Sequence, residues 1–170
     1  IFLPISLFPF ILIFAQEKHK NEAFPLKPLF TSRTRLVTNI NSSFSPFKFP
    51  QSSPNYTVIF EENFEGTTAF PPTGWKAINQ DGGGTTGPWF QGNTSIFTAY
   101  DGDGYAAANY QGANDFYIDE WLISPKISLI STSDTLCFWE RSPDYSSWAD
   151  SIEVRISTTD TAISSFSKKL

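Results

Sequence analysis

Two short loops combine aspartate with glycine, a composition that could bind a cation. Residues 79–84 read NQDGGG around Asp81, and residues 101–104 read DGDG. Calcium takes roughly six to eight oxygen ligands from carboxylates and carbonyls, and glycine lets carbonyl groups turn inward. Neither loop is an EF-hand, because a loop that begins at Asp101 has Ala106 in place of the required glycine. The same composition also suits a plain tight turn.

Further carboxylates lie near the ends of segments that resemble strands. A folded sandwich could bring them together with Asp81, and without a cation their mutual repulsion would cost stability. We therefore expect a structural calcium ion, Ca2+, bound by carboxylates from several segments. The predicted metal ligands are Glu62, Glu65, Asp81, Asp119 and Asp150.

The residue types do not favour catalysis. The single histidine, His19, lies in a polar stretch, and the single cysteine, Cys137, lies in the apolar run LCFWE and is interpreted as a core residue. A nucleophile activated by histidine is therefore not expected, and the sequence has no P-loop, HExxH or CxxC motif. A carboxylate pair for glycoside hydrolysis stays open as a weaker alternative, from the set Glu62, Glu65, Asp119, Glu120 and Glu140.

The aromatic residues divide between an expected core and one candidate binding loop. Trp75, Trp121 and Trp139 lie in strand-like runs and are expected to be buried, since large rings dominate burial. Tyr145 and Trp148 lie in the loop SPDYSSWAD, where they are candidate contacts for a sugar or a protein. Packing of this loop over the end of the sandwich is the alternative.

The two parts of the chain carry opposite charge. Residues 1–56 have six Lys/Arg and two Asp/Glu, a net charge of +4, whereas residues 57–170 have six Lys/Arg and fifteen Asp/Glu, a net charge of −9. An acidic surface repels phosphate backbones, so nucleic acid is not expected as a partner.

The strand-like segments that carry these residues follow a long N-terminal extension. Residues 1–15 are apolar and free of charge, like the apolar region of a secretory signal whose start is missing; a membrane anchor or a core strand is the alternative. Residues 16–55 are rich in Pro, Ser and Asn without a regular period, which predicts a poorly ordered linker or pro-segment. Residues 56–170 are expected to form the folded domain.

From residue 56 onward, short aromatic and β-branched runs alternate with loops rich in Gly, Pro, Asn, Asp and Ser. This spacing predicts an all-β fold, a jelly-roll antiparallel β-sandwich. A jelly roll needs about eight strands and the last residues offer no closing strand, so we expect the domain to be incomplete at its C-terminal end. The runs are YTVIFEENF, GWKAIN, PWFQG, SIFTAY, YAAANY, EWLISPKISL, DTLCFWERS and DSIEVRIST.

Four segments together resemble a known family. FEENFEG, FPPTGWKAINQDGGGTTGPW, DEWLISPKISL and ADSIEVRISTT occur in an order and spacing similar to the cleaved adhesin, or choice-of-anchor J, module of secreted Bacteroidota proteins, including the adhesin domains attached to gingipain proteases. The resemblance covers residues from about 58 to 160. It implies a jelly roll of the MAM-like or galactose-binding-like kind that binds structural calcium and has no catalysis of its own. Carried over by position, the resemblance implies calcium-ligand roles for Glu62, Glu65, Asp81, Asp119 with Glu120, and Asp150.

From these observations we expect a secreted or cell-surface adhesion module, non-catalytic and stabilised by calcium, that binds host or matrix proteins or glycans. We expect no membrane span in the mature domain, and covalently joined neighbouring domains. Two alternatives stay open: an accessory domain of a larger secreted peptidase or other hydrolase, and a carbohydrate-binding module.

Overall fold

The structure is a computed structural model, and its regular elements are almost all strands. It describes residues 2–4, 11–18, 29–39, 56–66, 69–95, 98–112, 118–129, 134–141 and 150–170. In chain order the elements are β1 (Phe2–Pro4), β2 (Ile11–Lys18), β3 (Leu29–Asn39), β4 (Tyr56–Glu62), β5 (Lys76–Asn79), β6 (Phe90–Asn93), β7 (Gly104–Ala108), the 3-10 helix η1 (Tyr110–Gly112), β8 (Glu120–Ile123), β9 (Asp134–Arg141), β10 (Asp150–Ser157), the 3-10 helix η2 (Ile163–Ser165) and β11 (Lys168–Lys169).

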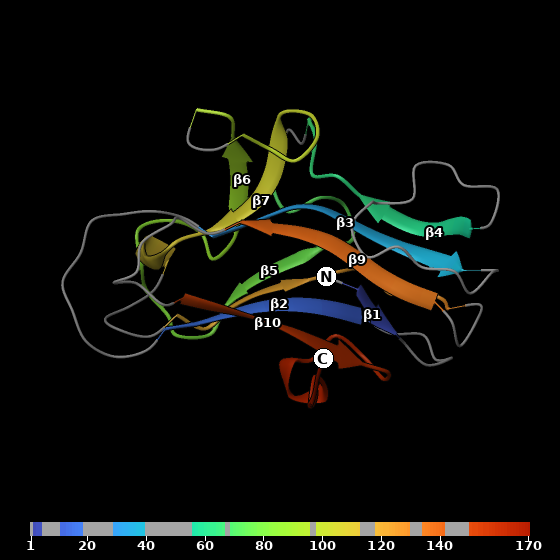
Figure 1. Cartoon of the computed structure of the whole chain (residues 1–170). Helices are drawn as coiled ribbons and strands as arrows, with labels where there is room; N and C mark the ends of the chain where they lie inside the picture. Colours follow the sequence, from blue (N-terminus) through green and yellow to red (C-terminus); the bar gives the residue numbers. More distant parts are fainter. Residues whose placement is uncertain are drawn as a thin grey trace.

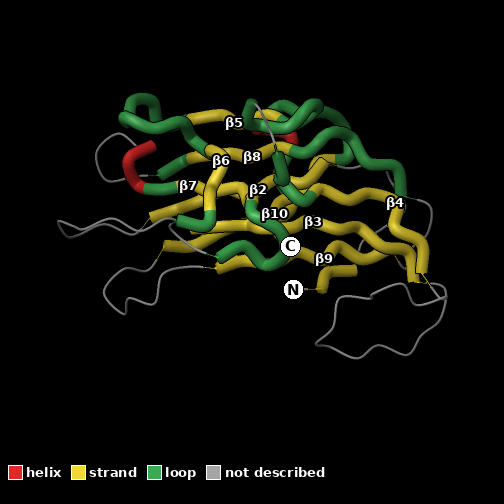
Figure 2. Tube along the Cα trace, turned by 90° about the horizontal axis from the view of Figure 1, so that it is seen from above, coloured by secondary structure: helices red, strands yellow, loops and turns green. Residues whose placement is uncertain are grey.

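The strands form two antiparallel sheets. One sheet has the order β1-β9-β3-β7-β6, with β4 also paired to β3, and the other has the order β11-β10-β2-β8-β5. In Figure 1 strands β3, β4, β6, β7 and β9 of the first sheet lie above β2 and β10 of the second, while β1 lies near the level of β2. Seen from above in Figure 2, most strands run in a similar direction, while β6 crosses them. The prediction of an all-β antiparallel fold is confirmed, and the jelly-roll connectivity stays a prediction.

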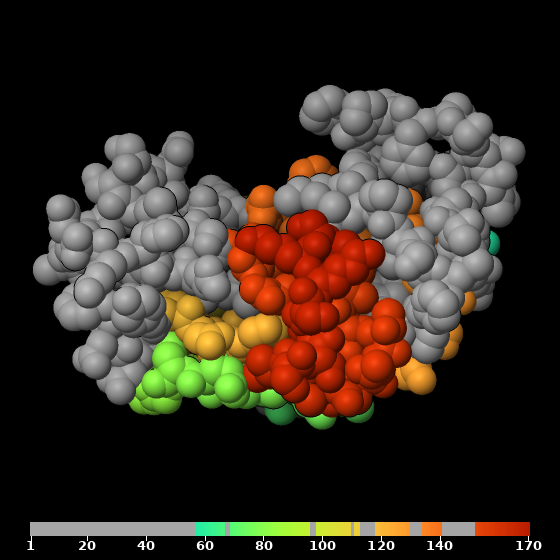
Figure 3. Space-filling view, turned by 90° about the horizontal axis from the view of Figure 1, so that it is seen from below, coloured from blue at the N-terminus to red at the C-terminus, as the bar shows by residue number. Residues whose placement is uncertain are grey.

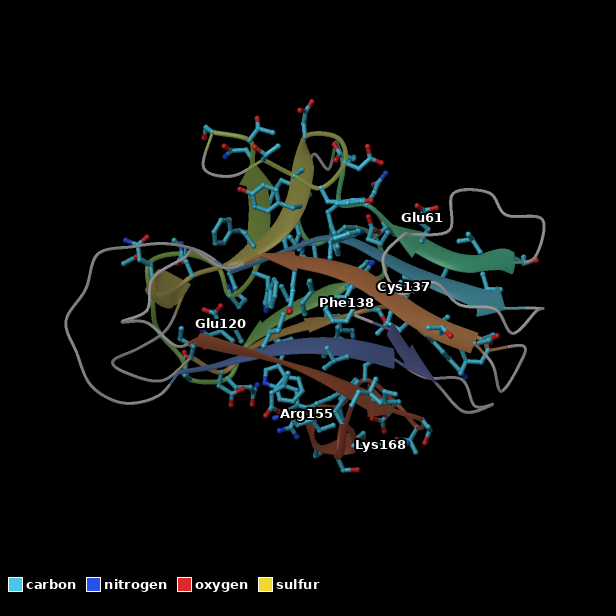
Figure 4. All side chains as sticks on the ribbon, in the orientation of Figure 1. Glu61, Glu120, Cys137, Phe138, Arg155 and Lys168 are labelled. Atoms are coloured by element: carbon cyan, nitrogen blue, oxygen red, sulfur yellow. The ribbon has the colours of Figure 1, made fainter. Side chains whose placement is uncertain are left out.

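Large side chains fill the space between the sheets. The main cluster contains Trp75, Trp89, Leu122 and Phe138, all at most 6% exposed, and Figure 4 shows Phe138 between the two layers. Every residue of β8 is buried, so this strand is covered on both faces. The predicted burial of Trp75 and Trp121 is confirmed. Cys137 is buried, as its apolar run predicted.

Strands from the N-terminal part of the chain pair with strands of both sheets. Strand β2 pairs with β8 and β10, and strand β3 pairs with β4, β7 and β9. Partners far along the chain set these pairings, and local periodicity does not report such partners. The division of the chain into domains stays a prediction. No helix among the described residues is long and apolar enough to cross a membrane.

The last residues fold back onto β10. Strand β11 pairs with β10, Lys169 forms an ion pair with Glu153, and Phe166 is buried against Trp121. Figure 3 shows this C-terminal segment, drawn in red, as one continuous area on the lower face. The segment therefore closes over the outer side of the five-stranded sheet around Trp121.

Candidate functional site

Sheet pairing brings Asp81 and Glu120 together from distant parts of the sequence. Strand β5 pairs with β8 in a register that places Asn79 opposite Glu120. Asp81 follows two residues after Asn79, and its Oδ2 accepts a hydrogen bond from the backbone N–H of Asp119 at 2.9 Å. The backbone N–H of Gln80 donates to the carbonyl of Asp119 at 2.9 Å. The loop after β5 is therefore fastened to the first residues of β8.

The glycines of this loop follow a path that other residues rarely adopt. Gly82, Gly83 and Gly84 have φ values of 67°, 96° and 82°, in the left-handed region that glycine enters without a Cβ penalty. The Asn79 side chain holds the turn from inside: its Oδ1 accepts from the N–H of Gly82 at 2.6 Å, and its Nδ2 donates to the carbonyl of Gly112 at 2.6 Å. The loop therefore wraps against η1.

Glu120 lies at the centre of this arrangement. Its side chain is fully buried, and a Cβ built at Gly112 would overlap Glu120 Oε1 and lie 3.0 Å from the carbonyl oxygen of Gly87. The carboxylate thus sits in a space lined by glycine backbone. Figure 4 places Glu120 at one end of the molecule, far from Glu61 on β4.

Three buried carboxylate oxygens have no hydrogen-bond partner among the described residues. They are Oδ1 of Asp81 and both Oε1 and Oε2 of Glu120. Buried polar groups are nearly always hydrogen-bonded, because an unpaired buried oxygen costs about 1–3 kcal/mol and more when charged. Such a group in a native fold requires a proton, a water or a cation beside it.

The electrostatics of the pair favour added positive charge. Burial and, as the smaller cause, the negative charge of Asp81 together raise the pKa of Glu120 from its ordinary value of 4.5 to about 9. A proton satisfies Glu120 when no other cation is present. A bound divalent cation would satisfy both carboxylates and would compete with that proton.

A pH prediction follows from this shift. Because the pKa of Glu120 is higher in the folded state, its protonation adds stability that is complete below about pH 4.5 and is lost as pH rises toward 9, by up to about 1.4 kcal/mol per pH unit. In chelator, the free energy of unfolding of the native chain should therefore fall relative to that of Glu120→Gln between pH 5 and pH 9. Urea unfolding of both proteins at three pH values measures this difference, and parallel curves would contradict it.

The donor set of the site suits a hard cation. Carboxylate oxygens of Asp81 and Glu120 and nearby glycine carbonyls are oxygen ligands, which calcium prefers. Within the described part of the chain, no group of three or more His, Cys, Asp or Glu side chains is placed to hold a metal. A cation here would therefore take its remaining ligands from backbone carbonyls, the Asn79 amide or water.

The other predicted ligands lie elsewhere or make local contacts. Glu62 Oε1 accepts from the N–H of Phe64 at 2.8 Å. Asp119 is exposed and accepts from the indole N–H of Trp121. Asp150 begins β10, but its side chain, together with Tyr145 and Trp148, lies outside the described residues. The metal and ligand-binding roles of these residues stay predictions.

Glu65 holds the DGDG turn directly. Its carboxylate accepts hydrogen bonds from the backbone N–H groups of Asp103 at 3.0 Å and Gly104 at 2.8 Å. A Cβ at Gly102 would overlap Glu65 Oε1. Here the acid binds backbone donors, so this loop is organised as a tight turn around a carboxylate.

Sequence reasoning left Glu120 out of the predicted ligand set in favour of Asp119. Glu120 is the first residue of β8, in which every residue is buried, whereas Asp119 precedes the strand and is exposed. The continuous apolar run WLI after Glu120 was the available signal.

Comparison with known protein families gave one match. The model of the Cleaved Adhesin Domain matches residues 57–170. No curated protein and no solved structure gave a match. The matched range includes Asp81, Glu120 and the strands that bring them together.

Proposed function

Because the chain belongs to the cleaved adhesin family, we propose that it is a non-catalytic adhesion module of the cell surface or extracellular space. Its partners are host or matrix proteins or glycans. The observation that supports the adhesive role is the family match over residues 57–170, which includes all strands from β5 to β11.

The proposal includes a structural calcium ion held by Asp81 and Glu120. Support comes from the three buried carboxylate oxygens that lack a hydrogen-bond partner in the described structure. Calcium supplies positive charge between the loop after β5 and the start of β8, and the two carboxylates bind it. Asn79 orients the loop through Gly82 and Gly112.

In this role the cation acts on adhesion indirectly. A loop fastened at both ends loses less conformational freedom on binding a partner, and preorganisation of this kind raises affinity. The ion also offsets negative charge in a part of the chain whose net charge is −9 over residues 57–170, which reduces self-repulsion in the folded state.

Adhesion itself is tested by retention on coated surfaces. The purified chain is applied to immobilised extracellular-matrix proteins, immobilised glycans and albumin, with calcium or with chelator. Saturable retention on a matrix or glycan surface above albumin, weakened by chelator, is the expected result. Equal, unsaturable retention on all surfaces would contradict the adhesive role.

A further inference from the structure

A second apolar cluster lies on the outer side of the five-stranded sheet, away from the main core. Leu122 of β8 packs into the main core, whereas its neighbour Trp121 packs into this second cluster together with Phe166. Phe166 is only 1% exposed, and its ring centroid lies 6.1 Å from that of Trp121. Residues 161–170, which we call the strap, therefore cover Trp121 from outside the sheet.

Charged groups fasten the strap to β10. The carboxylate of Glu153 is buried, forms an ion pair with Lys169 of the strap and accepts a hydrogen bond from Arg155 Nε at 2.7 Å. Arg155 also donates to the carbonyl of Phe166 at 3.4 Å. A buried carboxylate depends on such partners, because removing one of them leaves its charge uncompensated. The strap is thus closed by an ion-pair clasp as well as by the apolar contact of Phe166.

Contacts from the strap continue to the candidate cation site through Trp121. The guanidinium carbon of Arg155 lies 5.9 Å from the centroid of the Trp121 ring, within the range of a cation–π contact. The indole N–H of Trp121 donates to the carboxylate of Asp119, and the backbone N–H of Asp119 donates to Asp81 Oδ2 at 2.9 Å. The strap, the indole and Asp81 are therefore joined by a continuous series of contacts.

We propose that Trp121 is a positioning residue for the calcium site and that the closed strap holds Trp121 in this role. The indole fixes the Asp119 carboxylate, which keeps the N–H of Asp119 directed at Asp81 Oδ2. Asp81 Oδ1, which is buried and has no hydrogen-bond partner among the described residues, is then left for the cation. An open strap frees the ring and loosens Asp81. This inference rests on the proposed calcium site and names the element that regulates it.

Coupling of this kind acts in both directions. If closure of the strap raises calcium affinity by some factor, calcium raises the closing equilibrium of the strap by the same factor. Closure is visible at the amide of Leu170, whose N–H donates to the carbonyl of Val154 on β10 at 2.9 Å. Hydrogen exchange at Leu170 therefore reports opening of the strap independently of any calcium titration.

The test measures calcium affinity by isothermal titration calorimetry, at a temperature where melting curves in chelator show each variant to be folded. Trp121→Phe keeps an aromatic ring but has no indole N–H. Phe166→Ala and Lys169→Met open the strap by two routes, the first through the apolar contact and the second through the Glu153 clasp. Lys168→Met is the matched control, because Lys168 is the exposed neighbour of Lys169 in β11 whereas Glu153 pairs with Lys169.

Trp121→Phe should raise the calcium Kd about tenfold, the usual effect of losing a group that orients a metal ligand. Phe166→Ala and Lys169→Met should each raise the Kd about fivefold or more, and Lys168→Met should leave it unchanged. In the native chain, calcium should slow hydrogen exchange at Leu170 by about fivefold or more. In Trp121→Phe, calcium should have no such effect.

An unchanged Kd in Trp121→Phe would overturn the proposal and leave the calcium site in place. Weaker binding in Trp121→Phe alone, with exchange at Leu170 insensitive to calcium, would reject the role of the strap. Equal weakening by Lys168→Met and Lys169→Met would indicate a general charge effect and reject the clasp. A native chain that binds no calcium would overturn the calcium site and this inference together.

Discussion

Removing calcium is expected to lower the melting temperature of the folded chain by several degrees. An ion that binds only the folded state adds about 2.7 kcal/mol when its free concentration is a hundredfold above Kd. For a chain of this length, that corresponds to roughly 5–10 °C. Thermal unfolding in calcium and in chelator, followed by circular dichroism, measures the shift.

Two variants locate the effect. Glu120→Gln and Asp81→Asn each remove one charge of the pair and should make the melting temperature insensitive to calcium. Glu62→Gln is the matched control, because Glu62 contacts the N–H of Phe64 at the end of β4, and it should keep the calcium response. A native chain that melts at the same temperature in both buffers would contradict the cation site. If the effect of calcium on the melting temperature is lost in Glu62→Gln but kept in Glu120→Gln, the cation site lies at the end of β4 instead.

Replacing one loop glycine is expected to have the second large effect. In Gly84→Ala the new Cβ would lie 2.6 Å from the carbonyl oxygen of Gln111 and would overlap that of Gly112. The residue would also be held at a φ of 82°, which costs an L-residue roughly 1–2 kcal/mol. Because backbone cannot move aside as a side chain can, we expect a total loss of about 3 kcal/mol or more.

Gly82→Ala is the control for backbone strain. Gly82 has a similar φ of 67°, but a Cβ there would have nothing within 4 Å, so only the strain of roughly 1–2 kcal/mol is expected. Urea unfolding of both variants measures the difference. Equal losses of unfolding free energy in the two variants would mean that the close approach of the loop to η1 does not contribute to stability. A larger loss in Gly84→Ala, accompanied by weaker calcium binding, would support a loop shaped for the ion.

Much of the fold could be predicted from local patterns. GWKAIN and DSIEVRIST contain β5 and β10, and YAAANY overlaps β7, in which every residue is buried. Short apolar or alternating runs bounded by turn residues indicate strands. The prediction of a strand failed where an apolar run does not pair with another strand. In SIFTAY, residues 98–100 lie outside any strand, and Tyr100 stacks on Trp139.

The candidate site could be predicted only in part. Asp81 and its glycines were identified because their residue types carry the signal. Glu65 was also identified as important, but it holds the turn at Asp103, and no spacing rule distinguishes a carboxylate that accepts backbone N–H groups from one that binds a metal. The pairing of β5 with β8 depends on tertiary structure, so the partnership of Asp81 with Glu120 is not visible in either segment alone.

The most direct test of the cation site is a crystal structure of the chain grown with calcium, with anomalous diffraction used to locate the ion. We predict one ion bound by carboxylate oxygens of both Asp81 and Glu120, at distances of about 2.3–2.6 Å. An ion bound instead at Glu62 or Glu65, or a Glu120 carboxyl that stays protonated with no ion beside it at saturating calcium, would contradict the account.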